Sequence, residues 1–319
     1  MRVRFWGVRG STPTPLTRND LRERLRAALR GAAGLDLSSS DVVDAYLARL
    51  PAEIGDLIGG HTTCLSIETD DCFLIIDAGS GMRALGQALM QRPDFARGAG
   101  VAHILLTHGH WDHLQGYPFF APAYVAGNRL HFYAVNAEPA AFLRHQQTAP
   151  AYFPIAITEQ PATLSFRTLR EDEILPIGDL RISALSLYHP GTAYAFRIEQ
   201  SGKALVFASD AEYKSLTESG LRRYLSFFAD AEALVFDAQY ALRETFLQRA
   251  DWGHSSAIIG VDLAERANVR RLVLVHHDPN ASDDDIERAA EAARTYALVN
   301  DCHGDTEVIV GREGLELAI

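Results

Sequence analysis

A short histidine-rich segment constrains this chain more than any other part of its sequence. Residues 107–113 read Thr-His-Gly-His-Trp-Asp-His and directly follow the apolar run 104–106. Imidazole and carboxylate groups bind zinc, manganese and iron, and alternating positions of a loop can point toward two neighbouring ions. The segment therefore predicts a metal site at the end of a buried strand, and the competing interpretation is a solvated, histidine-rich turn. The four candidate ligands are His108, His110, Asp112 and His113.

Length and composition indicate one elaborated domain. The chain has 319 residues, of which 47% are hydrophobic, and no composition break divides it. A formal net charge of −11 argues against a surface that attracts nucleic acid or anionic lipid as a whole, although metal ions would still make one cleft positive. We find neither a signal-peptide pattern nor an apolar run that could cross a bilayer, so we expect a cytoplasmic protein without a membrane partner.

The cysteines do not form a recognisable motif. They are odd in number and lack the Cys-x-x-Cys spacing of zinc knuckles. Neither a disulfide framework nor a cysteine metal site is therefore predicted. Of Cys64, Cys72 and Cys302, we expect the first two to be reduced residues of a β-hairpin.

Apolar runs predict many strands and a smaller number of helices. Polar residues recur where these strands end or loops begin: Asp77, His108, His189, Asp210, His254 and His276. This pattern predicts two sheets packed face to face, with helices on the outer faces and a site in the loops at one end. The predicted strands are 3–7, 65–68, 73–76, 101–107, 130–134, 182–187, 194–198, 204–208, 233–237, 272–275 and 307–310. Helices are predicted after residue 81 and near 256–267 and 283–297.

Residues 16–58 predict a helical hairpin inserted before the main sheet. One helix has an apolar stripe, and a second follows serine capping candidates and stops at Pro51. The first helix is also basic, with Arg18, Arg22, Arg24, Arg26 and Arg30. Two interpretations stay open: a lid that reads substrate phosphate, or an amphipathic hairpin with an ordinary solvated face and a contact in a homodimer.

The motif His108-x-His110-x-Asp112-His113 resembles the signature of the metallo-β-lactamase superfamily. Three later segments follow the order of that family's further ligands: Tyr188-His189-Pro190, Ser209-Asp210 and Leu274-Val275-His276. The resemblance covers the chain apart from about 16–58. It implies an α/β (α+β) protein with a four-layer αββα sandwich, formed by residues 1–319 as a single domain.

The resemblance also implies two divalent metal ions, with zinc as the default and manganese or iron as alternatives. His108, His110 and His189 would bind the first ion, and Asp112, His113 and His276 the second. Asp210 would bridge the two ions. Taken alone, His189 or His276 would more often be a packed or surface residue than a ligand.

Two further residues are expected to contact the ligands without binding the metal ions. Asp77 resembles the family's aspartate that orients the histidine loop, although a turn aspartate before Gly79 is an equal alternative. His277 follows His276, and spacing alone cannot separate them because adjacent residues at a strand end point in opposite directions. The run 272–276 resembles the family's last motif, which favours His276 as the ligand and leaves His277 behind it.

Flanking segments resemble the branch that contains transfer-RNA 3′-processing phosphodiesterases and small cyclic phosphodiesterases. These segments are 5–13, 59–64 and Trp252-Gly253-His254-Ser255. His254 matches a histidine near the scissile phosphate, and it would protonate the departing oxygen or stabilise phosphate charge. Its alternative role is to cap the following helix. His61 replaces the branch's usual asparagine and is expected either to contact substrate or only to begin a strand.

Together these features imply hydrolysis of a phosphodiester by a hydroxide that bridges the two metals, with Asp112 and His254 in the catalytic group. Paired cations favour this reaction because they neutralise the nonbridging oxygens and align the attack. The chain has no long basic exosite, so a small cyclic nucleotide or similar compact diester is favoured over RNA. The alternatives are a lactonase or thioesterase of the same fold, and a sensor that binds a nucleotide without turning it over.

Overall fold

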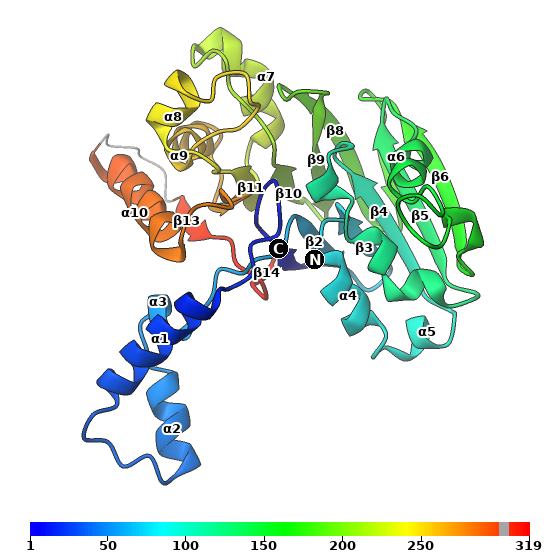
Figure 1. The fold of residues 1–319 in the computed structure, drawn as a ribbon. Helices are drawn as coiled ribbons and strands as arrows, with labels where there is room; N and C mark the ends of the chain where they lie inside the picture. The colour runs from blue at the N-terminus through cyan, green and yellow to red at the C-terminus, as the bar shows by residue number, and fades with distance from the viewer. Residues whose placement is uncertain (300–305) are drawn as a thin grey trace.

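Two seven-stranded sheets face each other in the computed structural model, which describes residues 1–299 and 306–319 (Figure 1). The first sheet has the strand order β14 (Glu316–Ala318), β1 (Arg2–Gly7), β2 (Cys64–Glu68), β3 (Phe73–Ile76), β4 (Val101–Leu106), β5 (Arg129–Val135) and β6 (Thr163–Leu169). The second has the order β13 (Glu307–Val310), β12 (Arg271–Val275), β11 (Ala233–Asp237), β10 (Lys203–Ala208), β9 (Ala193–Gln200), β8 (Leu180–Leu187) and β7 (Leu175–Ile177).

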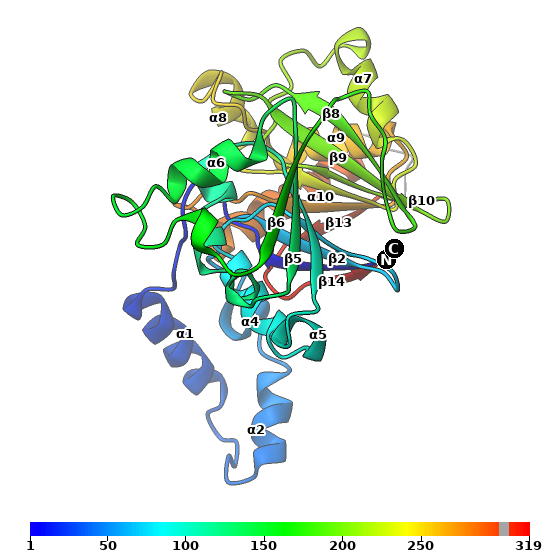
Figure 2. The ribbon, with the colours of Figure 1, turned by 90° about the vertical axis from the view of Figure 1, so that its right-hand side faces the viewer.

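Helices cover the outer faces of both sheets (Figure 2), and the predicted four-layer αββα architecture is confirmed. The first sheet carries α4 (Met82–Leu89), α5 (Pro93–Ala96) and α6 (Pro139–Gln146). The second carries α9 (Ala257–Arg266) and α10 (Asp283–Val299), with α7 (Glu218–Phe228) and α8 (Leu242–Leu247) packed against α9. Among the described residues, no helix combines the length and the apolar character needed to span a membrane.

The central strands are continuously apolar because both of their faces are covered. Along β3, Ile76 belongs to the core between the two sheets, whereas Ile75 belongs to the cluster beneath the outer helices. Successive strand residues point to opposite faces, so a strand buried on both sides needs an unbroken apolar run. The same rule explains why β6 was not predicted: it has an edge position and alternates exposed polar residues with partly buried ones.

The cysteine prediction can be checked at two of the three positions. Cys64 begins β2 and Cys72 precedes β3, and both thiols are buried and free. Burial raises the pKa of the Cys72 thiol to about 11, which leaves it protonated and unreactive at neutral pH. Cys302 lies outside the described residues.

The strands that precede the predicted site residues end at one edge of the sandwich. Parallel pairing joins β3 to β4 and joins β10, β11 and β12. Parallel strands that share a sheet bring their carboxyl ends to the same edge, which concentrates polar loop residues there. The two sheets are tied together at this edge, because the Tyr194 amide of β9 donates a hydrogen bond to the Thr107 carbonyl, 3.2 Å away, just after β4.

The predicted hairpin is present and extends away from the sandwich (Figures 1 and 2). It contains α1 (Arg18–Gly31), α2 (Ser40–Leu47) and the short α3 (Ala52–Gly55). Thr17 caps α1 and forms a reciprocal capping box with Asp20. Neither α1 nor α2 has a buried side chain. The segment therefore folds as a helical arm whose sides are open to solvent.

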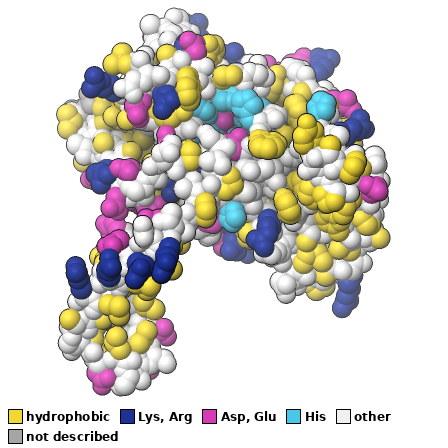
Figure 3. Space-filling view, viewed as in Figure 1, with side chains coloured by type: hydrophobic (Ala, Val, Ile, Leu, Met, Phe, Trp, Pro, Cys, Tyr) yellow, Lys and Arg dark blue, Asp and Glu magenta, His cyan; other side chains and the backbone are white. Residues whose placement is uncertain are grey.

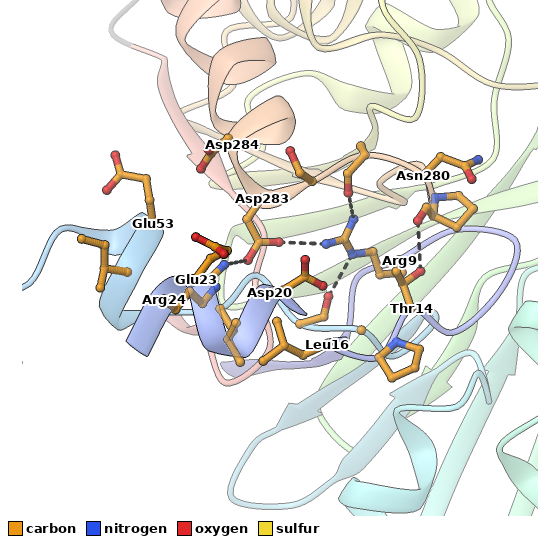
Figure 4. Close-up of a pocket in the computed structure, with 18 of the residues that line it drawn as sticks. Arg9, Thr14, Leu16, Asp20, Glu23, Arg24, Glu53, Asn280, Asp283 and Asp284 are labelled. Atoms are coloured by element: carbon orange, nitrogen blue, oxygen red, sulfur yellow. Dashed lines mark hydrogen bonds and ion pairs between the residues drawn. The ribbon is translucent and has the colours of Figure 1, made fainter. Parts of the chain in front are cut away.

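One carboxylate links the arm to the sandwich (Figure 4). Asp283 at the start of α10 pairs with Arg9 at 2.8 Å and with Arg24 of α1 at 2.7 Å. A cleft of about 640 Å³ lies here between α1, α3 and the start of α10. Its lining contains no histidine, so we do not place the metal chemistry in it.

Candidate metal centre

Two groups of donor atoms lie side by side where the strands end. Within each group the candidate ligand atoms all lie within 4.8 Å of one another. The first group is His108, His110 and His189, and the second is Asp112, His113, Asp210 and His276. Figure 3 shows a patch of histidine side chains on this face of the molecule, with other histidines lying apart from it. The structure thus brings together all seven residues that the resemblance implied as ligands, with Asp210 among the second set of donors.

Asp210 faces both groups of donors. One carboxylate oxygen, Oδ1, lies 3.3 Å from His113 Nε2, and the other, Oδ2, lies 3.2 Å from His276 Nε2 in the same group. Oδ2 also lies 3.9 Å from the Nε2 atoms of His108 and His189 in the first group. Asp210 would therefore be in reach of metal ions held by either group.

Two buried ring nitrogens indicate that the donors fit cations. Among the described residues, His108 Nε2 and His113 Nε2 have no hydrogen-bond partner, although two carboxylates lie 3.3 Å from the latter. Leaving a buried polar atom without a partner is costly, and a divalent ion would supply one. Imidazole and carboxylate donors without a thiolate suit zinc, manganese or iron. The donor set therefore fits metal ions on its own geometry.

Unusual backbone turns aim three of the site residues. Asp77, Asp210 and His276 follow β3, β10 and β12, and their φ angles are 59°, 59° and 58°. Left-handed backbone is uncommon for residues with a side chain, although aspartate and histidine adopt it more readily than most. The surrounding structure holds these residues in conformations that turn the chain sharply at the sheet edge.

Asp77 lies beside the histidine loop and hydrogen-bonds to it. Its Oδ2 accepts a hydrogen bond from His113 Nδ1 at 2.7 Å, and its Oδ1 accepts one from the Thr107 amide at 2.8 Å. The Thr107 hydroxyl in turn lies 3.0 Å from His108 Nδ1. Because the Nδ1 side of each ring is occupied, the Nε2 atoms are left to face the site.

We expect Asp77→Asn to weaken metal binding by about 10- to 100-fold, because the amide cannot hold the His113 ring as a carboxylate does. Titration of the metal-free protein with zinc under a competing chelator measures the change. Asp71→Asn, in an exposed turn between β2 and β3, is the matched control. An unchanged affinity in Asp77→Asn would show that this carboxylate does not tune the site.

His254 lies against both donor groups. Its ring stacks on the His276 ring with centroids 4.9 Å apart, and it lies 5.1 Å from the His189 ring. Its Nδ1 donates a hydrogen bond to Asp237 Oδ2 at 2.8 Å. The helix-capping alternative is wrong, because the cap of α9 is Ser256, whose side chain accepts a hydrogen bond from the Ile259 amide. His254 is thus free for a role at the site.

Two predicted site residues are not brought to the donors. His61 Nδ1 lies 3.1 Å from the Ser80 hydroxyl, which pairs with the adjacent Thr62 amide. His277 Nε2 donates a hydrogen bond to the Gly311 carbonyl at 3.1 Å. The His277 ring is turned from the ligands because neighbouring residues at a strand end point in opposite directions. The contacts of His277 therefore correct the expectation that it supports them.

Several contacts at the site were missed by sequence reasoning. His276 Nδ1 donates to Gln239 Oε1 at 3.1 Å, and His189 Nδ1 donates to the Gly253 carbonyl at 2.9 Å. The backbone amide of Ser11 donates to Asp112 Oδ2 at 2.7 Å. Asp237, the partner of His254, ends β11, so the strand-end signal that marked the ligands would have found it. The contact of the Ser11 amide could not have been predicted, because every residue except proline has a backbone amide.

The carboxylates and histidines of the second group shift one another's pKa. Burial alone disfavours a charged ring, yet Asp210 and Asp112 raise the pKa of His276 to about 9 and that of His113 well above its usual range. Burial opposes the charge of Asp112, but His113 and His276 hold its pKa well below the usual range. Burial and the neighbouring His113 lower the pKa of His108. A metal ion at His113 and His276 would therefore compete with protons for these rings.

Comparison with known proteins identifies the family. Residues 73–277 match the family described as "Beta-lactamase superfamily domain", and the chain belongs to this superfamily. It is 22% identical over 232 residues to the probable metallo-hydrolase YhfI of Bacillus subtilis (strain 168), which covers 70% of this chain and 83% of YhfI. It is 23% identical over 291 residues to ribonuclease Z of Bradyrhizobium diazoefficiens, which covers 73% of this chain and 88% of that enzyme.

Solved structures share the fold. The crystal structure of YhfI aligns with a TM-score of 0.61 at 18% identity, over 99% of this chain and 98% of that one. A diphosphatase from the PhnP family aligns with a TM-score of 0.59 at 15% identity, over 100% and 97%. The resemblance inferred from the sequence motifs is confirmed. The protein has the fold and the metal-donor groups of a metal-dependent hydrolase.

Proposed function

We propose that this protein is a phosphodiesterase that uses two metal ions. The observation that carries the proposal is the Asp237–His254 pair, which lies directly beside both donor groups. A phosphodiester has a poor alkoxide leaving group, and a positioned histidine can donate the proton that this group needs. An activated lactone or thioester leaves more easily, so the pair has less to do in those reactions.

The side chains of this site have separable roles in the proposed reaction. Two divalent ions, with zinc as the default and manganese or iron as alternatives, would supply charge for the nonbridging oxygens and activate the attacking water. Asp210 would contribute to holding both ions, and Asp112 to holding the second. Asp237 keeps the proton on His254 Nδ1, so that Nε2 is the atom that can serve the leaving oxygen.

A pocket beside the first donor group supports a compact substrate. It has a volume of about 410 Å³, and its lining includes His108, His110, Asn136, Phe142 and Tyr194. This size is in the range of small-molecule sites. We therefore propose a small cyclic nucleotide or a related compact diester as substrate. RNA is the second candidate class, which the similarity to ribonuclease Z favours.

We place the protein in the cytoplasm. The free thiols Cys64 and Cys72 are compatible with a reducing compartment, although their burial would protect them elsewhere too. A small-molecule substrate of the proposed class is also expected to be met there.

A substrate screen tests the proposal. Metal-reconstituted protein is incubated with cyclic mononucleotides, cyclic dinucleotides, short RNA and lactones, and product masses are measured. We expect hydrolysis of at least one compact diester. Strong lactone turnover with weak activity on bis(p-nitrophenyl) phosphate would support a lactonase instead, and nucleotide binding without any product would support a sensor.

We expect about two transition-metal ions per chain, because seven donors form two groups and Asp210 of the second group also faces the first. Elemental analysis of the purified protein measures the stoichiometry, and a chelator should remove both the metal and the activity. Re-addition of zinc, manganese or iron identifies the most active ion. A preparation that is fully active with one ion or none would rule out the two-metal mechanism.

A further inference from the structure

The aromatic side chains of Tyr240 and Trp252 lie next to His254. Trp252 precedes His254 by two residues, and 51% of its surface is exposed. The Tyr240 ring connects the two, with its centroid 5.7 Å from the His254 ring and 6.5 Å from the Trp252 ring. The Arg249 guanidinium lies 4.3 Å from the centre of the Trp252 ring. These residues therefore form a continuous surface that leads outward from the metal centre.

The structure holds Trp252 in place from both sides. Asp251, before it, accepts hydrogen bonds from the Lys214 ammonium at 2.8 Å and the Tyr188 hydroxyl at 2.7 Å. Gly253, after it, accepts a hydrogen bond from His189 Nδ1 at 2.9 Å. The residue after Trp252 is thus hydrogen-bonded to His189, one of the proposed metal ligands. A rigid aromatic side chain loses little entropy when a ligand binds to it.

The indole is only partly covered. Half of the surface of Trp252 stays exposed, although the Arg249 guanidinium lies over its ring. Tryptophan is usually well buried, so an open ring beside a reactive site indicates a binding surface. Within the described parts of the chain, the Arg249 guanidinium lies over the Tyr240 and Trp252 rings and no carboxylate pairs with it, which keeps positive charge beside these rings. In Figure 3 hydrophobic and basic side chains border the histidine patch on the side of α8.

We propose that Trp252, with Tyr240 and Arg249 behind it, is a subsite that stacks the planar base of a nucleotide. The inference rests on the proposed function, because it assumes that a phosphate binds at the metals and His254. Two residues of chain span at most about 7 Å, so a base at Trp252 and a phosphate at His254 are about one nucleoside apart. Stacking tolerates any base, so the subsite selects nucleotides as a class.

Isothermal titration of metal-loaded protein with adenosine 5′-monophosphate and ribose 5-phosphate tests the subsite. The two probes share the phosphate and sugar and differ in the base. We expect the nucleotide to bind about tenfold more tightly or better, Trp252→Ala to remove this preference, and Trp252→Phe to retain most of it. Tyr152→Ala, which truncates an aromatic side chain that is 79% exposed outside the site, is the matched control.

The subsite is overturned if both probes bind equally to the unmodified protein, or if Trp252→Ala keeps the preference for the base. These outcomes can be told apart from a failure of the proposed function. Hydrolysis of diesters without any base preference would reject the subsite alone. A base preference that depends on Trp252, in a protein that hydrolyses no diester, would support the subsite and reject the phosphodiesterase.

The helical arm carries a second, independent inference. Leu21, Leu25 and Leu29 of α1 are four residues apart, so they share one face of the helix, and all three are exposed; Leu29 is 68% exposed. Short amphipathic helices gain their stability mainly by burying their apolar face. We therefore expect the leucine face of α1 to be buried against another molecule.

We infer that the partner is the arm of a second copy of this chain. Helix α1 has five arginines and two acidic residues, a net charge of +3 that stays positive after Arg24 is paired with Asp283, whereas α2 has two aspartates and no basic residue, a net charge of −2. A two-fold axis would place each α1 against the α2 of the other copy, where opposite charges meet and the leucines are covered. An arm with helices of opposite charge is self-complementary, which favours a second copy over an unrelated partner.

Light scattering during size-exclusion chromatography tests this association. We expect a dimer for the unmodified protein, and a rise in the dimer Kd of at least about a hundredfold for Leu25→Glu/Leu29→Glu. Ile174→Glu, an exposed apolar position on the sandwich, is the control and should stay dimeric. A monomeric unmodified protein, or a double variant that dimerises normally, would overturn the inference. Circular dichroism confirms that the sandwich of the variants is folded.

Discussion

Asp210→Ala is expected to lower turnover by at least about a thousandfold. The Asp210 carboxylate faces both donor groups, so its loss removes a ligand from each proposed ion and the charge that holds them together. Metal ions supply several kcal/mol of transition-state stabilisation, and about 4 kcal/mol corresponds to a thousandfold in rate. The sandwich should stay folded, because its core between the sheets is apolar. His110→Ala should act in the same direction.

Steady-state kinetics, elemental analysis and circular dichroism check this prediction together. Asp230→Ala is a well-matched control, since Asp230 is also an aspartate with a positive φ, 53°, but lies at an exposed turn where it pairs with Asn268. It should retain turnover and metal. If Asp210→Ala were folded and fully active, the site assigned here would be the wrong one.

His254→Ala is expected to lower turnover by roughly a hundredfold on a diester with a poor alkoxide leaving group. Both metals should stay bound, because the seven donors do not include His254. On bis(p-nitrophenyl) phosphate the loss should shrink, since nitrophenolate departs without a proton. Asp237→Asn should show the same pattern more weakly, because it disturbs the hydrogen bond that holds His254 Nδ1.

The comparison of two leaving groups separates the possible roles of His254. Equal losses on both substrates would assign it to charge stabilisation on the phosphate instead of proton transfer. Loss of metal from the variant would make it a ligand, which its donor distance to His189 and Asp210 allows. His131→Ala, a histidine that pairs with Ser165 on the first sheet, is the control and should leave turnover and metal unchanged.

The neighbouring pair His276 and His277 marks a limit of sequence reasoning. Both follow the same apolar strand, and only the backbone turn at His276, with a φ of 58°, directs that ring to Asp112 and Asp210. The three-residue strands β7 and β14 were missed for a related reason, because they are too short to show a period of their own. Their pairing depends on longer strands elsewhere in the chain.

The sequence by itself determined the chemical types of the donors and the buried strands that carry them. Metal binding requires particular side chains, and a strand covered on both faces requires an unbroken apolar run. Both features can therefore be recognised in the sequence. Only the tertiary structure decided which distant groups complete the site. The Ser11 amide meets Asp112 across 101 residues, and Asp237 meets His254 where two chain segments converge. Such contacts depend on backbone direction and on strand order, which the types of the residues involved do not encode.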